Sequence, residues 1–436
     1  LLGIAAGTPL AAAWEWMAGQ PAASSFTRLP LSLTGFITMV ALSRLVLGPW
    51  LDRGAPLGFG RLGRQRGWAL LLILLAIPFQ IMIGLSTPGI APVAGLVLAI
   101  VGGALLATID AWRAEAAEPR AQGILAAGQY IGAFAPSIAV NAGTVLAGVG
   151  AETVSAIGGT LALIVGALAL PIVGGRTLPD RAPDPASFPP VRRFLAREPN
   201  LSGLGRRVSV GLYGAVVCPI SVWFARLGPV AGAVLVFLLV DAVAQEGGLS
   251  ILTPLVTAGD FSLQRLTLLT SVRALEPLAQ IVGVIPAAIV IARLSARRAL
   301  PWAALATLFG HIAVLAAIPA MPSVTVYIVV QMLLAFLQGF GFVIWVAWLA
   351  TVVVRPFTGW HLTILGVVVA GVFEPFHLTP AVVAALGTSG SILLFALFSV
   401  AALALALWLA RHGPAAAVEA WPEGTGTEGN GDTSHR

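Results

Sequence analysis

Long apolar runs separated by short polar gaps make up most of this sequence. A helix that crosses a bilayer needs about 20 consecutive, mostly apolar residues, and the runs reach this length repeatedly. With 58% hydrophobic and 10% charged residues, a chain of 436 residues could not hide its apolar surface in one soluble core. The sequence therefore predicts an all-α membrane protein with twelve transmembrane helices. These are expected near 1–18, 31–51, 68–87, 91–113, 121–148, 154–174, 229–252, 263–293, 299–319, 323–351, 357–383 and 387–410.

A polar stretch rich in arginine and proline, residues 174–207, divides the runs into two groups of six. Its prolines exclude a continuous membrane-buried helix, because each removes a backbone donor. Within the following residues, 208–227 is apolar, but Cys218-Pro219 is expected to interrupt it and Arg226 to close it, which favours an interfacial helix. The predicted organisation is a six-helix bundle over 1–174, a cytoplasmic linker over 175–228, a second six-helix bundle over 229–410 and a disordered cytoplasmic tail over 411–436.

Arginines fall in alternate gaps between the predicted helices. Basic residues follow predicted helices 2, 4, 6, 8, 10 and 12, whereas the intervening gaps carry almost no basic charge. Because positively charged loops stay on the cytoplasmic side of the membrane, both termini are expected in the cytoplasm. A thirteenth span at 208–227 would invert this pattern for the whole second half, which argues against it.

Several classes of function are disfavoured. The net charge of +6 does not indicate a nucleic-acid partner, because all 24 basic residues are arginines and most lie in the gaps. Cys218 is the single cysteine, which excludes an internal disulfide and a cysteine-based zinc site. His311, His361 and His377 lack metal-ligand spacing, so no metal or other cofactor is expected. There is no nucleotide-binding loop and no nucleophile with a neighbouring base, so the sequence does not indicate an enzyme.

Charged residues cluster where predicted helices 2 and 4 reach the cytoplasm. Asp110 and Arg113 are three residues apart and are expected to pair on one helix face. Ion pairs that form in one state and break in another would make this end a gate; topological charge and a static surface ion pair are the alternatives. The predicted cytoplasmic gate comprises Arg44, Asp52, Arg53, Arg64, Asp110, Arg113 and Arg120.

A second group of charges lies within the predicted membrane helices, where each costs about 2.5–3.5 kcal/mol to insert. Asp241 is about 12 residues, or roughly 18 Å, into predicted helix 7, which places it near the midplane. A carboxyl group at that depth is suited to carrying a proton; a permanently neutral acid bonded to a neighbouring helix is the alternative. Arg273 and Glu276 are three residues apart and could neutralise each other. The predicted proton-coupling residues are Asp241, Glu246 and Glu276.

Four motifs resemble one known family. They are Pro49-Trp-Leu-Asp-Arg53, Gly63-Arg-Gln-Arg-Gly-Trp68, Asp110-Ala-Trp-Arg113 and Ala292-Arg-Leu-Ser-Ala-Arg-Arg-Ala-Leu300. Together they resemble the AmpG-type muropeptide permeases of the major facilitator superfamily, in the branch shared with acetyl-coenzyme A transporters and some siderophore permeases. The resemblance implies proton-coupled import of anhydromuropeptides across a bacterial inner membrane. The chain departs from the family at Leu239-Val-Asp-Ala242, where a Lys-Leu-Gly-Asp is common.

The resemblance also implies where the substrate passes, because helices 1, 4, 7 and 10 line the central path of that superfamily. The partners expected from it are a small anionic solute such as a sugar-peptide, protons and the lipid bilayer, and the chain is expected to be a monomer. A siderophore or acyl-coenzyme A transporter of the same branch, and a non-transporting pigment-binding or assembly member of the fold, are the alternatives. The predicted path residues are Glu15, Arg273, Gln331, Gln338, Trp345, Trp348 and Glu374.

Overall fold

The structure is a computed structural model. It describes residues 62–84, 91–116, 118, 121–147, 151–170, 188–198, 202–250, 275–320, 323–355, 357–373 and 378–419, together with scattered positions between 5 and 59. Most of the first two predicted helices, 1–18 and 31–51, lies outside the described residues.

The described chain is almost entirely helical, and its helices follow the apolar runs. The first half contains α3 (Arg64–Gly84), α4 (Ala91–Ala116), α5 (Gln122–Ala147) and α6 (Ala151–Ala169). The second half contains α10 (Pro229–Ser250), α13 (Glu276–Leu294), α14 (Ala296–Ala317), α15 (Val324–Leu349), α16 (Thr358–Phe373) and α17 (Leu378–His412). Among the described residues, seven helices are long and apolar enough to cross a membrane.

The last two predicted helices, 357–383 and 387–410, correspond to the described segments 358–373 and 378–412. Helix α16 is described from Thr358 to Phe373 and α17 from Leu378 to His412, and the helical geometry of α17 is interrupted at Gly387. Gly387 has a φ of 68°, a left-handed conformation that glycine adopts without steric cost. Gly387 therefore separates two helices, at the residue where the sequence predicts the last helix to begin.

The linker contains α7 (Pro189–Arg197), α8 (Gly203–Leu212), the π-helical turn η3 (Tyr213–Val217) and α9 (Cys218–Leu227). The last three form one continuous helix, Gly203–Leu227, so the predicted interruption at Cys218-Pro219 is wrong. By length and composition this helix is one of the seven that could cross a membrane, although the sequence favoured an interfacial helix at 208–227. The wide turn η3 directly precedes Pro219 and accommodates the proline without ending the helix. Trp223 Nε1 donates a 2.7 Å hydrogen bond to the Val352 carbonyl, which fastens α9 to the end of α15.

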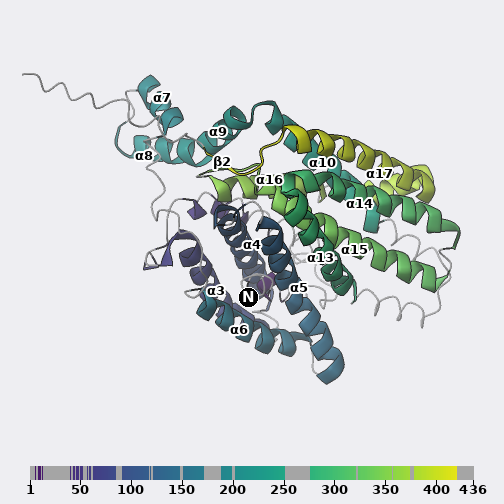
Figure 1. Ribbon diagram of the computed structural model, residues 1–436. Coiled ribbons are helices and arrows are strands. Elements are labelled where there is room, and N and C mark those ends of the chain that lie inside the picture. The colour runs from purple at the N-terminus through teal and green to yellow at the C-terminus, as the bar shows by residue number, and fades with distance from the viewer. Residues whose placement is uncertain are drawn as a thin grey trace, which may run out of the picture.

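The final described segment lies beside the residues that follow α15. Strand β1 (Val354–Arg355) pairs in parallel with β2 (Val418–Glu419). Disorder was predicted from residue 411 onward, but residues 411–419 complete α17 and form this pairing. The pairing places the chain after α17 beside the α15–α16 connection (Figure 1).

The two halves pack through α5 against α13 and through α4 against α16 (Figure 1).

Within the second half, glycines allow helices α13 and α15 to approach each other closely. A Cβ added at Gly283 would lie 2.0 Å from the Phe336 carbonyl oxygen, and one at Gly339 would lie 2.0 Å from the Gln280 carbonyl oxygen. Helices α13 and α15 therefore cross backbone to backbone, as small residues permit in membrane proteins.

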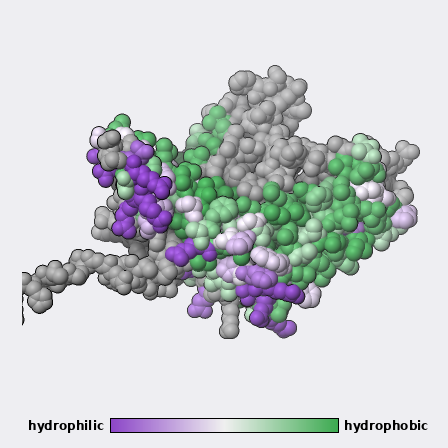
Figure 2. All heavy atoms as spheres, turned by 90° about the horizontal axis from the view of Figure 1, so that it is seen from above, coloured by the Kyte–Doolittle hydropathy of each residue, from purple (hydrophilic) through white to green (hydrophobic). Residues whose placement is uncertain are grey.

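Large apolar side chains cover the outer faces of the second half. Leu397 on α17 is 66% exposed and Phe309 on α14 is 51% exposed, among many similar residues. Figure 2 shows this apolar surface over the second-half helices, with one group of hydrophilic residues at the end that carries α7 and α8 and another along the lower edge of the view. An apolar surface of this extent is stable in lipid and not in water.

Candidate functional site

Two groups of buried polar side chains stand out. The first, here called the inter-half network, joins the ends of α3, α4, α15 and α16. It consists of Arg44, Asp52, Arg64, Asp110, Arg113 and Glu115, with the amides and glutamines that contact them.

Asp52 connects the halves through the N-terminus of α16. Its Oδ1 accepts a 3.0 Å hydrogen bond from the Gly359 amide, and its Oδ2 accepts a 2.8 Å bond from the Trp360 amide. First-turn amides have no partner within their own helix, and the helix dipole favours a negative group beside them. A Cβ on Gly359 would lie 2.9 Å from Asp52 Oδ1, so this contact depends on glycine.

Asp52 is only 7% exposed, and this burial raises its pKa to about 7. The positive charge of Arg64 and the two amide donors lower the pKa, but by less than burial raises it. Asp52 is therefore poised to exchange a proton near neutral pH while it holds the two halves together.

Arg64 and Glu115 form a buried bidentate ion pair. Arg64 Nη2 lies 2.8 Å from Glu115 Oε1 and 3.0 Å from Oε2, and Arg64 Nη1 donates to the Asp52 carbonyl oxygen at 2.9 Å. Gln65 also donates to Glu115 Oε2. From the other half, Arg355 Nη2 donates to the Glu115 backbone carbonyl at 3.3 Å. Glu115 thus receives donors from both halves.

Arg113 also bridges the halves, through its three guanidinium nitrogens. Nη1 donates to Gln122 Oε1 at 2.7 Å, Nε to Gln129 Oε1 at 3.1 Å and Nη2 to the Val346 carbonyl of α15 at 3.2 Å. Asp110 lies 3.6 Å from Arg113, the pair that their spacing predicts. The guanidinium therefore spans α4, α5 and α15.

Five of the seven predicted gate residues meet in this network: Arg44, Asp52, Arg64, Asp110 and Arg113. Arg44 joins it through Asp110, at 3.8 Å. Arg53 and Arg120 lie outside the described residues. Glu115 was not predicted, because in the sequence it looks like one more charge after a helix.

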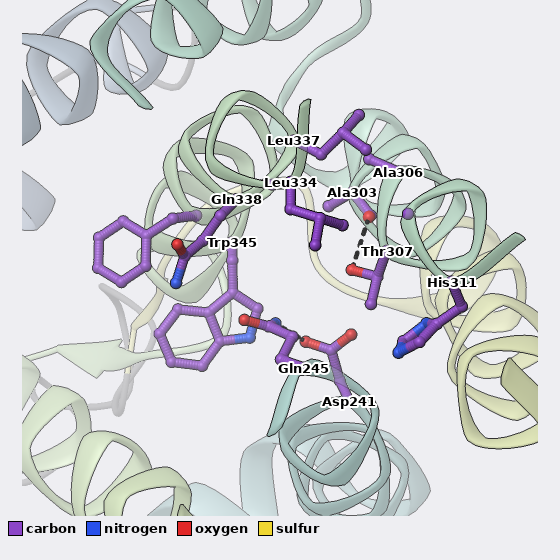
Figure 3. Close-up of a pocket in the computed structure, with 13 residues that line it drawn as sticks. Asp241, Gln245, Ala303, Ala306, Thr307, His311, Leu334, Leu337, Gln338 and Trp345 are labelled. Carbon is purple, nitrogen blue, oxygen red and sulfur yellow. Dashed lines mark hydrogen bonds between the residues drawn. The ribbon is translucent and has the colours of Figure 1, made fainter. Parts of the chain in front are cut away.

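The second group lines a cavity of about 60 Å³ inside the second half. Helices α10, α14 and α15 surround it, and its polar groups point inward (Figure 3). A cavity of this size holds a few water molecules, whereas a site for a drug-sized ligand measures about 300–1,000 Å³. The polar and aromatic residues that line it are Asp241, Gln245, Thr307, His311, Gln338, Phe342 and Trp345.

Hydrogen bonds connect this cavity to the first half. Gln245 Nε2 donates to Asp241 Oδ2 at 2.6 Å. On another wall, Gln338 Oε1 accepts from Gln280 Nε2 at 2.8 Å, and Gln280 Oε1 accepts from the Tyr130 hydroxyl of α5 at 3.3 Å. A movement between α5 and α13 would therefore reach the cavity wall through two glutamines.

The remaining predicted site residues lie elsewhere. Glu276 accepts a 2.6 Å hydrogen bond from Gln331, and neither residue lines the cavity. Trp348 is fully buried and packs edge-on against Phe237 with ring centroids 5.2 Å apart. Of the predicted set, Gln338, Trp345 and Asp241 share the cavity. Glu15, Arg273, Glu374 and the side chain of Glu246 lie outside what the structure describes.

Solved structures of three transporters, one of them described as a member of the major facilitator superfamily, have a similar fold. The proton:xylose symporter XylE, bound to 6-bromo-6-deoxy-D-glucose, superposes with a TM-score of 0.60 at 13% identity, covering 94% of each chain. A bacterial homologue of the iron transporter ferroportin gives 0.54 at 12% identity, covering 94% of this chain and 98% of the other. The human organic anion transporter MFSD10 gives 0.63 at 14% identity, covering 93% and 97%.

These superpositions establish the fold, but at such low sequence identity they do not establish a shared activity. No protein-family model matches the sequence, and no curated protein matches it. The chain shares the fold of these three transporter structures, and its function is argued from its own residues.

Proposed function

We propose that this chain is a proton-coupled secondary active transporter that imports an anhydromuropeptide across a bacterial inner membrane. The observation that carries the proposal is the Asp52 carboxylate seated on the first-turn amides of α16, a buried contact between the halves. A transporter that alternates its access must break such contacts in every cycle.

In the proposed cycle, the inter-half network closes the cytoplasmic end while the opposite end admits substrate. Opening the cytoplasmic end exposes Asp52, Glu115 and Arg64 to water. Hydrogen bonds to water then replace those lost between the halves. The network therefore acts as a latch whose closed and open states differ little in free energy. Both termini and the linker lie on the cytoplasmic side in this arrangement.

Proton coupling is assigned to Asp241. Its carboxyl group is 4% exposed, lies inside a membrane helix and has a neutral amide as its hydrogen-bond donor, so ionisation there depends on water or on a nearby base. A permanently neutral acid would also satisfy Gln245. The two alternatives differ in whether gradient-driven accumulation survives Asp241→Asn, a change that preserves shape and hydrogen bonding but removes ionisation.

The substrate class follows from the motif resemblance and not from the fold. The similar structures carry titles that name xylose, iron and organic anions, so one fold serves unrelated solutes. A sugar-peptide is our first choice because the loop motifs resemble muropeptide permeases. A siderophore or an acyl-coenzyme A is the second choice, since transporters of both share that branch.

The test is uptake into proteoliposomes that contain the purified protein. Labelled anhydromuropeptide, ferric siderophore and acetyl-coenzyme A would each be supplied outside, with and without an inward proton gradient. The proposal expects anhydromuropeptide alone to accumulate, and only with the gradient. Accumulation of another solute would change the substrate, and no gradient-dependent accumulation of any solute would favour a non-transporting member of the fold.

A further inference from the structure

His311 shares the Asp241 cavity, although no proposed step so far uses it. The residue lies on α14 and is only 2% exposed. Figure 3 shows its ring reaching into the cavity that Asp241 enters from α10. Its Nδ1 lies 3.1 Å from the Ser399 hydroxyl of α17.

The Ser399 hydroxyl indicates which ring nitrogen carries the hydrogen. Ser399 has one hydroxyl hydrogen, and it donates this to the Phe395 carbonyl at 3.1 Å. A lone pair of the same oxygen then faces His311 Nδ1, so Nδ1 must supply the hydrogen for both contacts to hold. This assignment leaves Nε2 unprotonated, with its lone pair available to accept a proton.

The Nε2 lone pair has no hydrogen-bond donor among the described residues. A buried nitrogen without a partner is unfavourable, so a donor in the cavity would stabilise this ring. Asp241 offers one, because Gln245 occupies its Oδ2 and leaves Oδ1 for the cavity. A polar cavity of about 60 Å³ also has room for a water molecule between the two groups.

We propose that His311 Nε2 receives the coupling proton from Asp241, so that the two residues form a proton relay within the second half. In the transfer, the Asp241 O–H bond breaks and an Nε2–H bond forms, directly or through one water. The products are a carboxylate and an imidazolium, with the Nδ1 hydrogen still donated to Ser399. The relay rests on the proposed function, since it names the second protonatable group of the Asp241 site.

No other titratable side chain lines this cavity among the described residues. On the helices that pack against α14, the other described titratable groups lie apart from it. Glu276 on α13 is occupied by Gln331. These other groups are Glu276 and Arg293 on α13, Tyr327 on α15, and Arg411 and His412 on α17.

Infrared difference spectroscopy of the purified protein tests the relay without any substrate. Subtracting the spectrum of Asp241→Asn from that of the wild type identifies the Asp241 carboxyl C=O band. His311→Asn keeps a donor for Ser399 but removes the Nε2 acceptor, so this band should move to higher wavenumber. His412→Asn, a change at an exposed position on α17, is the matched control and should leave the band in place.

A band that stays unchanged in His311→Asn would overturn the relay, as would the absence of a protonated Asp241 band at every pH at which the protein stays folded. Nitrogen-15 NMR of histidine-labelled wild type tests the tautomer even if that variant fails to fold. The expected resonances are a protonated Nδ1 and an unprotonated Nε2 for His311. The opposite tautomer would overturn the assignment.

Transport separates the relay from the proposed function. His311→Gln places an amide near the Nε2 position but cannot accept a proton, so gradient-driven accumulation of anhydromuropeptide should be lost while exchange persists. Wild type that moves no anhydromuropeptide would refute the proposed substrate, and the spectra would still decide the relay. Equal accumulation by the variant and wild type would reject the role of His311 while leaving Asp241 in place.

Discussion

The inter-half network and the Asp241 cavity both hold buried ionisable groups, but they satisfy them differently. In the network, both carboxylate oxygens of Glu115 accept from Arg64 Nη2, and Asp52 accepts two backbone amides. In the cavity, Asp241 has one neutral donor, and His311 Nε2 has no partner among the described residues. The carboxylates of the network have several hydrogen-bond donors each, whereas the cavity contains a nitrogen that can still accept a proton.

The difference indicates that one region stabilises the contact between the halves, here called the holding region, and another is suited to changing its protonation, here called the switching region. A buried charge with a full set of partners is costly to disturb, so it stabilises one arrangement of the halves. A buried group with few partners changes its protonation when a proton becomes available, which is what a coupling site requires. Because the two lie at different positions, a proton on Asp241 can affect the inter-half network only through packing, for example through Gln338, Gln280 and Tyr130.

The largest expected effect comes from removing the Glu115 charge. Glu115→Gln would leave Arg64, 4% exposed, without a counterion, and breaking a buried pair typically costs about 3–5 kcal/mol. The thermal unfolding temperature of the purified protein should fall sharply. Glu118→Gln changes an exposed acid three residues further on and is the control. Equal unfolding temperatures for the two variants would show that the network does not stabilise this state.

The Asp52 contact should be weaker than the Glu115 pair but more local. Asp52→Asn keeps one acceptor oxygen but replaces the other with an NH₂ group, which cannot accept the second amide hydrogen, and leaving a buried donor unsatisfied costs about 1–3 kcal/mol. Hydrogen exchange at the Gly359 and Trp360 amides should therefore become faster, with exchange in α14 unchanged as the internal control. Transport should fall while expression is retained. Unaltered exchange at both amides would contradict this interpretation of the contact.

The network should also respond to pH through Asp52. Its pKa is raised to about 7 by burial, above the ordinary value of 3.8. If the open state exposes Asp52 to water, the closed state binds more protons between these two values. The closed population should therefore fall as pH rises from about 4 to 7 and then level off. Spin-label distances between the halves, measured at pH 5 and 8, check this.

The matching control for the pH response is Asp52→Asn, which should show the same distances at both pH values. Labelling requires Cys218→Ser, because Cys218 is the single native cysteine. Distances that respond to pH equally in the variant would assign the effect to another group.

The sequence identified most residues of the inter-half network but not the contacts that they make with the other half. Arg44, Asp52 and Arg113 were identified because charge is sparse in this sequence and these residues fall near the cytoplasmic ends of predicted helices 2 and 4. Their partners in the other half were not identified, because the α16 amides and the Val346 carbonyl are backbone groups far away in the chain. Arg113 and Val346, for example, are 233 positions apart. Periodicity and charge patterns describe one helix at a time, so contacts between halves need the folded arrangement.

The cavity illustrates the same limit for a single residue. Asp241 was predicted as the proton site because a charge at that depth needs a reason. His311 was considered only as a metal ligand, because nothing in its spacing relates it to Asp241. Only the packing of α10 and α14 against α15 brings the two side chains into one cavity. The fold itself was more predictable, since apolar run length fixed most helices to within a few residues.

The smallest expected effect tests whether the cavity is as dispensable for stability as its few contacts suggest. Gln245→Met removes the one described donor to Asp241 while keeping side-chain length, and loss of a typical hydrogen bond costs about 0.5–1.5 kcal/mol. The unfolding temperature should fall far less than in Glu115→Gln, and exchange at the Gly359 and Trp360 amides should match wild type. A loss of stability comparable with that of Glu115→Gln would mean that the Asp241–Gln245 bond is structural, and the division between a holding region and a switching region would not stand.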